Sequence, residues 1–264
     1  MSRHELTDQQ WKIIEPLLPK RKSKVGRPPI DSRQVLNGII YILKTGCAWA
    51  DLPRKYGSPT TCWRRLRDWQ KLGIWDRIWR KLLQLLDEQD KLDLSQVYLD
   101  GSFVPAKRGG DEIGTTKIGK GSKIMLVAER NGVPIGLHVT SAQPHELRLA
   151  EKALASIRIP GKRGRPKKRF GELVADRAYH SQEFRRFLRK RGIKVTIPVK
   201  KNTKKKKGRP MALGDGYKQR WKIERCFAWL DNYRRLIVRH ERLIQHYKAF
   251  CYLALILLCL NRIV

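Results

Sequence analysis

The stretch SQVYLDGSFV, residues 95–104, is a β-prone apolar segment that runs into an aspartate, Asp100. A second stretch, ELVADRAYHS at residues 172–181, repeats this pattern and runs into Asp176. An unpaired buried carboxylate is costly in free energy. We therefore predict that each aspartate lies at a strand end, beside a partner group or a metal ion.

The chain is strongly basic. Of its 264 residues, 58 are Lys or Arg and 24 are Asp or Glu, which gives a net charge of +34. A hydrophobic content of 41% with eight Trp residues is enough to bury a core, which excludes disorder throughout. A positive field of this size favours a polyanionic partner, and nucleic acid is the usual one. Ribosomal proteins and membrane-surface proteins share this composition, so charge alone does not name a function.

The cysteines form no CxxC pair and have no histidine at zinc-site spacing, so they are interpreted as reduced thiols of a cytosolic protein. They are Cys47, Cys62, Cys226, Cys251 and Cys259. The N-terminal sequence MSRHELTDQQWK has no signal-peptide pattern. The apolar stretch at residues 249–260 is shorter than an ordinary membrane span and predicts a buried helix. The sequence thus predicts a cytoplasmic protein without a membrane partner.

Residues 1–92 have the pattern of a helical domain. Thr7 followed by Gln10 predicts a capping box at the start of the first helix. Apolar spacing predicts three more helices, at residues 31–46, 58–73 and 74–89. The third of the four helices is basic, which favours a helix-turn-helix-like DNA-binding module. Its candidate DNA contacts are Arg64, Arg65 and Arg67. The alternative is a plain helical bundle with a solvated basic face.

The periodicity changes in residues 93–264, which we predict to form a second domain. Strand-like segments at residues 123–130 and 133–142 are joined by Asn131-Gly132, a strong hairpin signal. Further elements are predicted as helices at 145–157 and 181–192, strands at 172–176 and 194–199, and a long helix from near Gly216. This order predicts a mixed α/β domain around a central sheet.

Carboxylates are scarce in this second domain, which holds 39 Lys and Arg but 14 Asp and Glu. A third candidate beside the two aspartates is Glu224, which shares one helical face with Tyr217 and Arg220 at i, i+3 and i+7. Three carboxylates from two strands and a helix could hold two divalent cations such as Mg²⁺, in the arrangement used for phosphoryl transfer. For any single carboxylate, a salt bridge to a nearby arginine is the alternative.

Several of these stretches resemble a known family. The segments YLDGSFV, ADRAYHS and YKQRWKIERCFAWL resemble the three motifs of the DDE transposases of bacterial insertion sequences, in the group called family five. The N-terminal LTDQQWKIIEPLLP and GRPPIDSRQVLNGIIYILKTGCAWADLP resemble the leading domain of that group, so the resemblance covers nearly the whole chain. It implies an RNase-H-like catalytic domain with Asp100, Asp176 and Glu224 as catalytic ligands of two Mg²⁺ ions, for which Mn²⁺ can substitute.

The resemblance also implies a reaction and partners. The enzyme would cleave double-stranded DNA at the transposon ends and join the 3′-OH to target DNA, as a homodimer or higher oligomer at the bacterial nucleoid. Tyr217 and Arg220 would orient the DNA backbone or the glutamate helix. The group's third motif has a base seven residues after the glutamate, where this chain has Asp231. If the helix continues, Arg235 lies about 20° from the direction of Glu224 and is predicted to make the phosphate contact instead.

The tripeptide Gly-Arg-Pro recurs at residues 26–28, 164–166 and 208–210. The middle copy, in KRGRPKKRF, resembles an AT-hook core, which lies in a narrow A·T minor groove. Its candidate DNA contacts are Arg165, Lys167 and Lys168. The alternative is a basic surface loop. For the whole chain, the alternatives to a transposase are a non-catalytic DNA-binding protein and a general metal-dependent nuclease.

Overall fold

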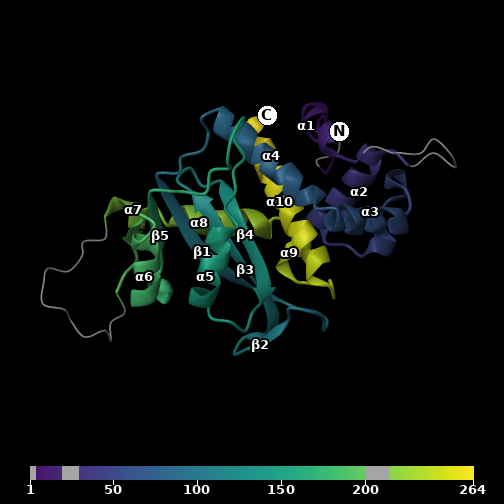
Figure 1. The fold of residues 1–264 in the computed structure, drawn as a ribbon. Helices are drawn as coiled ribbons and strands as arrows, with labels where there is room; N and C mark the ends of the chain where they lie inside the picture. Colours follow the sequence, from purple (N-terminus) through teal and green to yellow (C-terminus); the bar gives the residue numbers. More distant parts are fainter. Residues whose placement is uncertain (1–3, 20–29, 200–213) are drawn as a thin grey trace, which may run out of the picture.

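The computed structural model of the chain describes residues 4–19, 30–199 and 214–264. Figure 1 shows a central sheet with helices on its faces and a group of helices beside it. The α-helices are α1 (Asp8–Ile14), α2 (Ser32–Thr45), α3 (Pro59–Lys71), α4 (Ile74–Glu88), α5 (Glu146–Ala155), α6 (Gln182–Arg189), α7 (Asp215–Lys218), α8 (Trp221–Asp231), α9 (Arg234–Ile237) and α10 (Ile244–Ile263). The strands are β1 (Gln96–Pro105), β2 (Gly114–Thr116), β3 (Gly119–Glu129), β4 (Pro134–Ser141), β5 (Glu172–Ala175) and β6 (Lys194–Thr196).

The N-terminal helices begin and end at their capping residues. The Thr7 side chain accepts a hydrogen bond from the backbone N–H of Gln10, and the Gln10 side chain accepts one from the N–H of Thr7, so the predicted capping box is confirmed. The Asp31 carboxylate caps the start of α2. Gly46 ends α2 with a φ of 72°, a conformation that glycine adopts without strain.

A short turn joins α3 to α4. It consists of Leu72 and Gly73, and the φ of Gly73 is 66°. The connection from α2 to α3 is longer and contains two 3-10 turns, η2 (Trp49–Asp51) and η3 (Arg54–Tyr56). Helix-turn-helix modules use a short turn that often contains glycine. Within this helical region, α3 and α4 are therefore the pair with a connection of that kind.

The strands form one mixed sheet in the order β2-β3-β1-β5-β6, with β4 paired to β3. β1, β3 and β4 are antiparallel neighbours, whereas β5 and β6 run parallel to β1. The predicted hairpin is confirmed as β3 and β4, with Gly132 in their turn at a φ of 80°. Parallel strands need a crossover, and α5 and α6 supply the helical segments that lead into β5 and β6. The predicted mixed α/β class is thus confirmed.

The two motif aspartates follow neighbouring positions of this sheet. Leu99 of β1 is opposite Ala175 of β5, and each aspartate is the next residue along the chain. β5 ends at Ala175, whereas β1 continues through Asp100 to Pro105 with β3 as its partner. The prediction that Asp100 ends its strand is therefore wrong. What ends at this position is the pairing of β1 with β5, which leaves space at the sheet edge for side chains from other elements.

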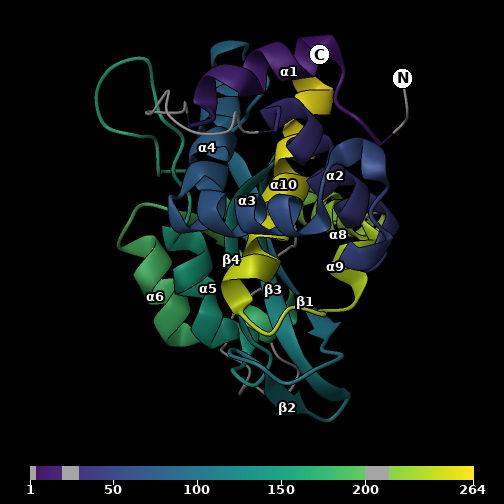
Figure 2. The ribbon, with the colours of Figure 1, turned by 90° about the vertical axis from the view of Figure 1, so that its right-hand side faces the viewer.

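Helices cover both faces of the sheet. α5 packs on β3 and β4 on one face, and α8 packs on β1 and β3 on the other. α10 lies between the sheet and the N-terminal helices, in contact with α3, α4 and β4 (Figure 2). By length and composition α10 could span a membrane, but 67% of its apolar window is buried within the protein. Here it is a core helix, as the apolar stretch at 249–260 predicted.

One hydrophobic core runs through both parts of the chain. Trp79 of α4 packs against Tyr252 of α10, with ring centroids 5.7 Å apart. Residues 1–92 and 93–264 thus share an interior. Their division into two domains stays a prediction from the sequence.

The segment after Gly214 is broken into several helices, so the predicted long helix from near Gly216 is wrong. α8 ends at Asp231, and the chain is extended at Tyr233, with φ −95° and ψ 92°. The Tyr233 side chain is buried, and the turn brings α9 against α2. The strand predicted at residues 194–199 is shorter, because β6 ends at Thr196. The strand β2 was not predicted, since its three residues are too short to carry a periodic signal.

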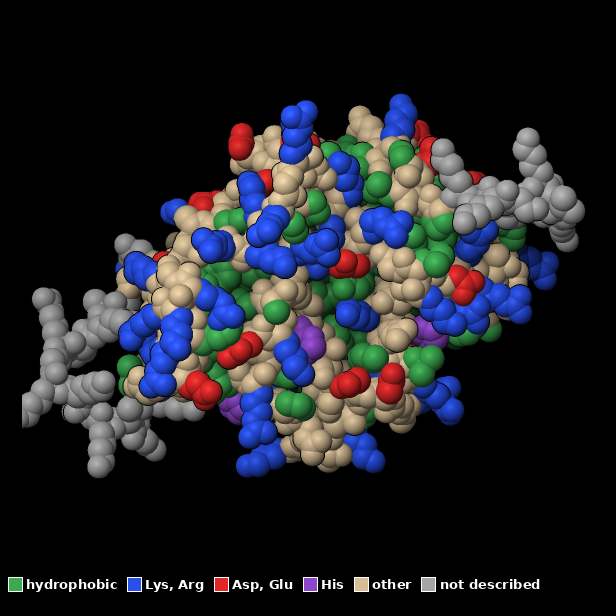
Figure 3. Space-filling view, viewed as in Figure 1, with side chains coloured by type: hydrophobic (Ala, Val, Ile, Leu, Met, Phe, Trp, Pro, Cys, Tyr) green, Lys and Arg blue, Asp and Glu red, His purple; other side chains and the backbone are tan. Residues whose placement is uncertain are grey.

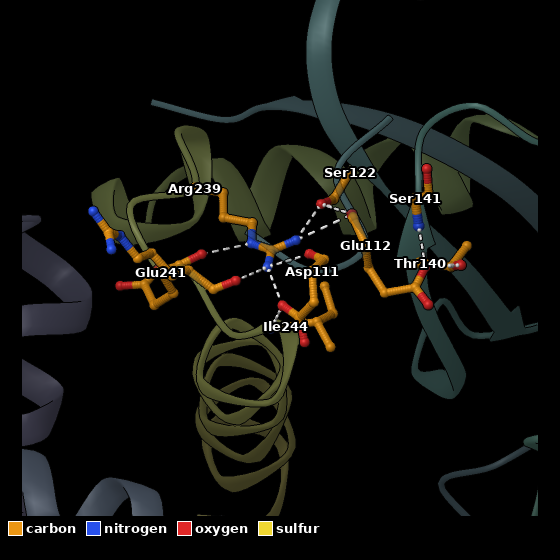
Figure 4. A network of polar contacts seen from close by, with 9 residues as sticks. Asp111, Glu112, Ser122, Thr140, Ser141, Arg239, Glu241 and Ile244 are labelled. Atoms are coloured by element: carbon orange, nitrogen blue, oxygen red, sulfur yellow. Dashed lines mark hydrogen bonds and ion pairs between the residues drawn. The ribbon is translucent and has the colours of Figure 1, made fainter. Parts of the chain in front are cut away.

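A buried arginine ties the start of α10 to the strands (Figure 4). The Arg239 side chain is fully buried, and its backbone N–H donates to the Pro105 carbonyl at 2.8 Å. Its guanidinium pairs with the Asp111 carboxylate at 3.0 Å and donates to Ser122 Oγ at 2.6 Å. The same guanidinium also donates to the carbonyls of Asp111, Glu112, Glu241 and Arg242. These bonds fix the end of β1 relative to α10.

Candidate active site

One arginine bridges two of the three predicted carboxylates. Arg220 immediately precedes α8, and its guanidinium donates to Asp100 Oδ2 at 3.1 Å and to Glu224 Oε1 at 2.9 Å. The side chains of Asp100 and Arg220 are each 18% exposed, whereas that of Glu224 is 59% exposed. The fold therefore brings Asp100 of β1 and Glu224 of α8 to the same guanidinium group.

Asp176 lies beside this group at the end of β5. It begins the 3-10 turn η4 (Arg177–Tyr179), where its Oδ1 accepts a hydrogen bond from the Ala178 N–H at 2.7 Å. Its negative charge acts on both Asp100 and Arg220. All three carboxylates that the motifs predicted are thus brought to one edge of the sheet.

A fourth carboxylate, which the sequence analysis missed, lies at the same edge. Glu146 is the first residue of α5, and its Oε1 lies 3.8 Å from Lys123 Nζ. A Cβ atom on Gly101 would lie 3.0 Å from Glu146 Cδ, so the glycine next to Asp100 provides the space for this side chain. Nothing in HELRLAEKALASI distinguishes Glu146 from the other acidic residue of that helix, so no local signal could have found it. The carboxylate cluster is defined here as Asp100, Glu146, Asp176 and Glu224.

A buried tyrosine hydroxyl adjoins this cluster and was also missed. Tyr179 in η4 is fully buried, and its hydroxyl makes no hydrogen bond of normal geometry with the described residues. Burial raises the pKa of Tyr179, and the negative charges of Glu146, Asp100 and Asp176 raise it further, together with the close approach of the Glu146 carboxylate to the hydroxyl.

The electrostatics of Asp100 reflect these neighbours. Burial raises the pKa of Asp100, and the positive charge of Arg220 opposes that shift. A hydrogen bond from the Gly101 N–H at 2.9 Å also opposes it, whereas the negative charges of Glu146 and Asp176 add to it. Asp100 is therefore a partly buried carboxylate in a field of like charge, an environment that a divalent cation would stabilise.

The chemistry of the donor set fits a divalent cation. Carboxylate oxygens are the ligands that Mg²⁺ prefers. Among residues 4–19, 30–199 and 214–264, no three Asp, Glu, His or Cys side chains converge closely enough to hold an ion as they stand. In their present positions, Asp100 and Glu224 share the single positive charge of Arg220.

The face of α8 beside the site is aromatic and basic. The Arg225 guanidinium lies 4.6 Å from the ring centroid of Trp221 and 4.7 Å from that of Trp229. The Trp221 side chain is exposed. Tyr217, predicted to orient DNA or the glutamate helix, is half-buried and packs against the core.

The predicted phosphate contact of Arg235 is corrected by the structure. That prediction required one helix through residue 235, and the chain leaves α8 at Asp231. Arg235 is 7% exposed, pairs with Glu241 at 2.7 Å and donates to the Cys47 carbonyl at 3.1 Å. The side chain therefore holds α9 against the end of α2 and has a structural role.

The three arginines predicted on α3 differ in their surroundings. Arg64 is exposed. Arg65 lies 5.8 Å from the Trp69 ring centroid, and Arg67 lies 5.2 Å from that of Trp63. Arg67 also pairs with the neighbouring carboxylate of Asp68 at 2.8 Å. Their contact with DNA stays a prediction, and Arg64 is the best placed of the three to make it.

The middle Gly-Arg-Pro copy lies in an exposed loop. Arg165, Lys167 and Lys168 are all exposed. Lys167 pairs with Asp87 of α4 at 2.8 Å, and its backbone forms a bridge with Ile159. The copies at 26–28 and 208–210 lie wholly outside the described residues. Figure 3 shows Lys and Arg side chains spread over the whole visible face, with fewer acidic ones between them.

Family models match both parts of the chain. Residues 92–261 match the model described as "Transposase DDE domain", and residues 6–79 match "Putative transposase of IS4/5 family". This chain belongs to the DDE transposase family. The resemblance drawn from the three sequence motifs is thereby confirmed, and the general function of this DDE transposase is transposition.

Named relatives agree with this assignment. An uncharacterized 16.2 kDa protein of insertion element IS402 from Burkholderia cepacia is 43% identical over 122 residues, which are 44% of this chain and 83% of the relative. A putative transposase for IS402 from the same organism is 37% identical over 148 residues, which are 56% of this chain and 66% of the relative.

A solved structure shares the fold of this DDE transposase. The piggyBac transposase, in a synaptic complex with hairpin DNA, matches 96% of this chain and 70% of its own, with a TM-score of 0.53 and 11% identity. At that identity the likeness concerns the fold. It supports the predicted RNase-H-like sheet with a helical N-terminal region.

Proposed function

We propose that this transposase binds the terminal inverted repeats of its insertion sequence, cleaves the DNA at their ends and joins each 3′-OH to target DNA. One observation carries the proposal. Asp100 and Asp176 directly follow the last paired residues of two adjacent parallel strands, and Glu224 is linked to Asp100 through Arg220. Two strands and a helix thus deliver three carboxylates to one edge of the sheet.

The cofactor of the proposed reaction is Mg²⁺, as two ions held by Asp100, Asp176 and Glu224, with Mn²⁺ able to substitute. When bound, such ions activate the attacking oxygen and stabilise the leaving oxygen of a phosphodiester. The chain itself keeps the carboxylates in place. The Ala178 N–H holds Asp176, and Arg220 holds Asp100 and Glu224 until a phosphate group or a cation competes for them.

The basic surface would bind the DNA backbone. Arg220 contacts Glu224 and would orient DNA near the site, together with Tyr217 of the preceding helix α7. The α3 arginines and the loop around Arg165 would add contacts with phosphate that weaken as salt concentration rises. Two transposon ends must be joined, so we propose at least a homodimer on DNA, acting at the nucleoid in the bacterial cytoplasm.

A strand-transfer assay tests this proposal. Labelled DNA carrying the ends of the element that encodes this chain is incubated with protein and Mg²⁺ or Mn²⁺. Wild type is compared with Glu224→Gln and with Glu183→Gln, which removes the same charge from an exposed position of α6. We expect cleavage and joining by wild type and Glu183→Gln, and a loss of both of at least 100-fold for Glu224→Gln with end binding retained.

Two other results would each assign a different function. Cleavage without joining would identify a metal-dependent nuclease. Binding without cleavage by wild type would identify a non-catalytic DNA-binding protein. The second outcome has a specific structural basis, because Asp231 stands where the family has a base and the buried Arg235 does not replace it.

A further inference from the structure

We propose that Glu146 is a fourth carboxylate of the metal site and binds the cation together with Asp100 and Asp176. The proposal rests on the proposed function, since it presumes that the sheet edge holds a divalent cation. It adds a ligand from α5, an element that contains none of the three motifs.

The local structure places Glu146 at this edge. It is the first residue of α5, and the preceding His145 caps the helix by accepting a hydrogen bond from the Leu147 N–H at 3.2 Å. α5 is in turn packed on β3 and β4. Gly101 leaves room for the glutamate, because a Cβ atom there would lie 3.0 Å from Glu146 Cδ and 3.1 Å from Glu146 Cγ. A capped helix and the absence of a side chain on Gly101 thus hold Glu146 against the residue that follows Asp100.

The charge balance of the cluster favours a cation. Of the carboxylates that act on Asp100, Glu146 acts more strongly than Asp176. The cluster has four carboxylates, and the basic side chains paired with them are Arg220, with Asp100 and Glu224, and Lys123, with Glu146 at 3.8 Å. Four negative charges against two positive ones leave an excess of two. In a chain with a net charge of +34, this local excess matches one divalent cation.

Tyr179 is an independent observation that points to a bound ligand. Its hydroxyl is fully buried next to Glu146, Asp100 and Asp176, and it makes no hydrogen bond of normal geometry with the described residues. A buried donor that approaches an acceptor, here Glu146, without normal hydrogen-bond geometry is costly. A Glu146 carboxylate turned toward a cation would accept the missing hydrogen bond. Partners of this kind commonly orient the ligands of metal sites.

Direct measurement of Mn²⁺ binding tests the assignment without reference to activity. Mn²⁺ is titrated into the full chain, and the free ion is followed by electron paramagnetic resonance. Wild type is compared with Glu146→Gln and with Glu151→Gln, which removes the same charge from an exposed position of the same helix. We expect Glu146→Gln to weaken Mn²⁺ binding about tenfold or more and Glu151→Gln to change it less than twofold. Melting temperatures confirm that each variant is folded.

A second variant separates position from charge. Gly101→Ala keeps all four carboxylates, but its methyl group would lie 2.8 Å from Met125 Sδ and 3.0 Å from Glu146 Cδ and would displace both side chains, so we expect it also to weaken Mn²⁺ binding. Asp100→Asn distinguishes a failure of the Glu146 assignment from a failure of the three-carboxylate metal site. If Asp100→Asn loses Mn²⁺ and Glu146→Gln binds it like wild type, the assignment of Glu146 is overturned and the three-carboxylate site stands. If wild type binds no Mn²⁺, or Asp100→Asn binds it equally well, both proposals fail.

Discussion

At the scale of a single residue, the ionised Asp100 carboxylate of the proposed metal site lowers the stability of the fold. Burial raises the pKa of its carboxyl, although Arg220 at 3.1 Å opposes the shift. A carboxyl whose pKa is higher in the folded state than in the unfolded chain binds its proton more tightly when folded. Its contribution to stability is therefore full below the unfolded pKa and is lost as pH rises through the folded pKa. At neutral pH, ionised Asp100 lowers the free energy of unfolding.

We expect Asp100→Asn to raise the melting temperature at pH 7, because the amide removes the partly buried charge and keeps an acceptor for Arg220. The gain should shrink as the pH falls through the raised pKa of Asp100, because the wild-type carboxyl then takes up its proton. Differential scanning calorimetry measures both effects, and for a chain of this size 1 kcal/mol corresponds to about 2–4 °C. The exposed Glu183→Gln is the control. A lower melting temperature of Asp100→Asn at pH 7 would show that the pairing with Arg220 outweighs burial.

At the scale of elements, α3 shows that not every arginine of a basic helix is available to bind phosphate. Its arginines look equivalent in the sequence, but the Arg67 guanidinium is already paired with Asp68 at 2.8 Å and stacked on Trp63, whereas Arg64 is exposed. A charge that already has a carboxylate partner gains less from a phosphate. The element therefore contributes fewer effective cations to DNA binding than its composition predicts.

We expect Arg64→Ala to reduce the slope of log binding constant against log salt concentration by about 0.9, the value for one lost phosphate contact. Arg67→Ala should change that slope less, since its charge is partly neutralised within α3. Fluorescence anisotropy with duplex DNA at several salt concentrations measures both slopes. Equal slopes for wild type and Arg64→Ala would remove α3 from the DNA interface.

At the scale of the whole molecule, the C-terminal helix joins the two regions that the sequence separates. α10 packs on α3 and α4 as well as on β4, and Arg239, in the segment that leads into α10, binds Asp111 and Ser122. A core shared in this way couples the folding of its parts. The N-terminal helices are thereby held in a fixed place relative to the sheet edge that carries the carboxylate cluster.

We expect thermal unfolding of the full chain to be a single cooperative transition, with calorimetric and van't Hoff enthalpies nearly equal. Calorimetry at low protein concentration measures this ratio. Arg239→Lys should lower the melting temperature of that one transition, because lysine has three donors and cannot replace the arginine fork. Two separate transitions, with only one affected by Arg239→Lys, would instead show that residues 1–92 and 93–264 unfold as independent domains.

Structural features that depend on residues close together in the chain were predicted correctly. The capping box at Thr7, the hairpin turn at Asn131-Gly132 and the apolar segments before Asp100 and Asp176 each depend on residues within a few positions of one another. Hydrogen-bonding and backbone preferences act at that range, so sequence alone determined most elements, the α/β class and three of the carboxylates now found at one sheet edge.

The tertiary structure decided what depends on residues far apart in the chain. Arg235 was misplaced because the turn at Tyr233 is set by the packing of α9 on α2, a contact about 190 residues apart that a helical wheel does not contain. Glu146 and Tyr179 were missed because only the pairing of β1 with β5 and the packing of α5 bring them to Asp100. Burial and charge at this edge are properties of that assembly, since they depend on which chain segments exclude water from it.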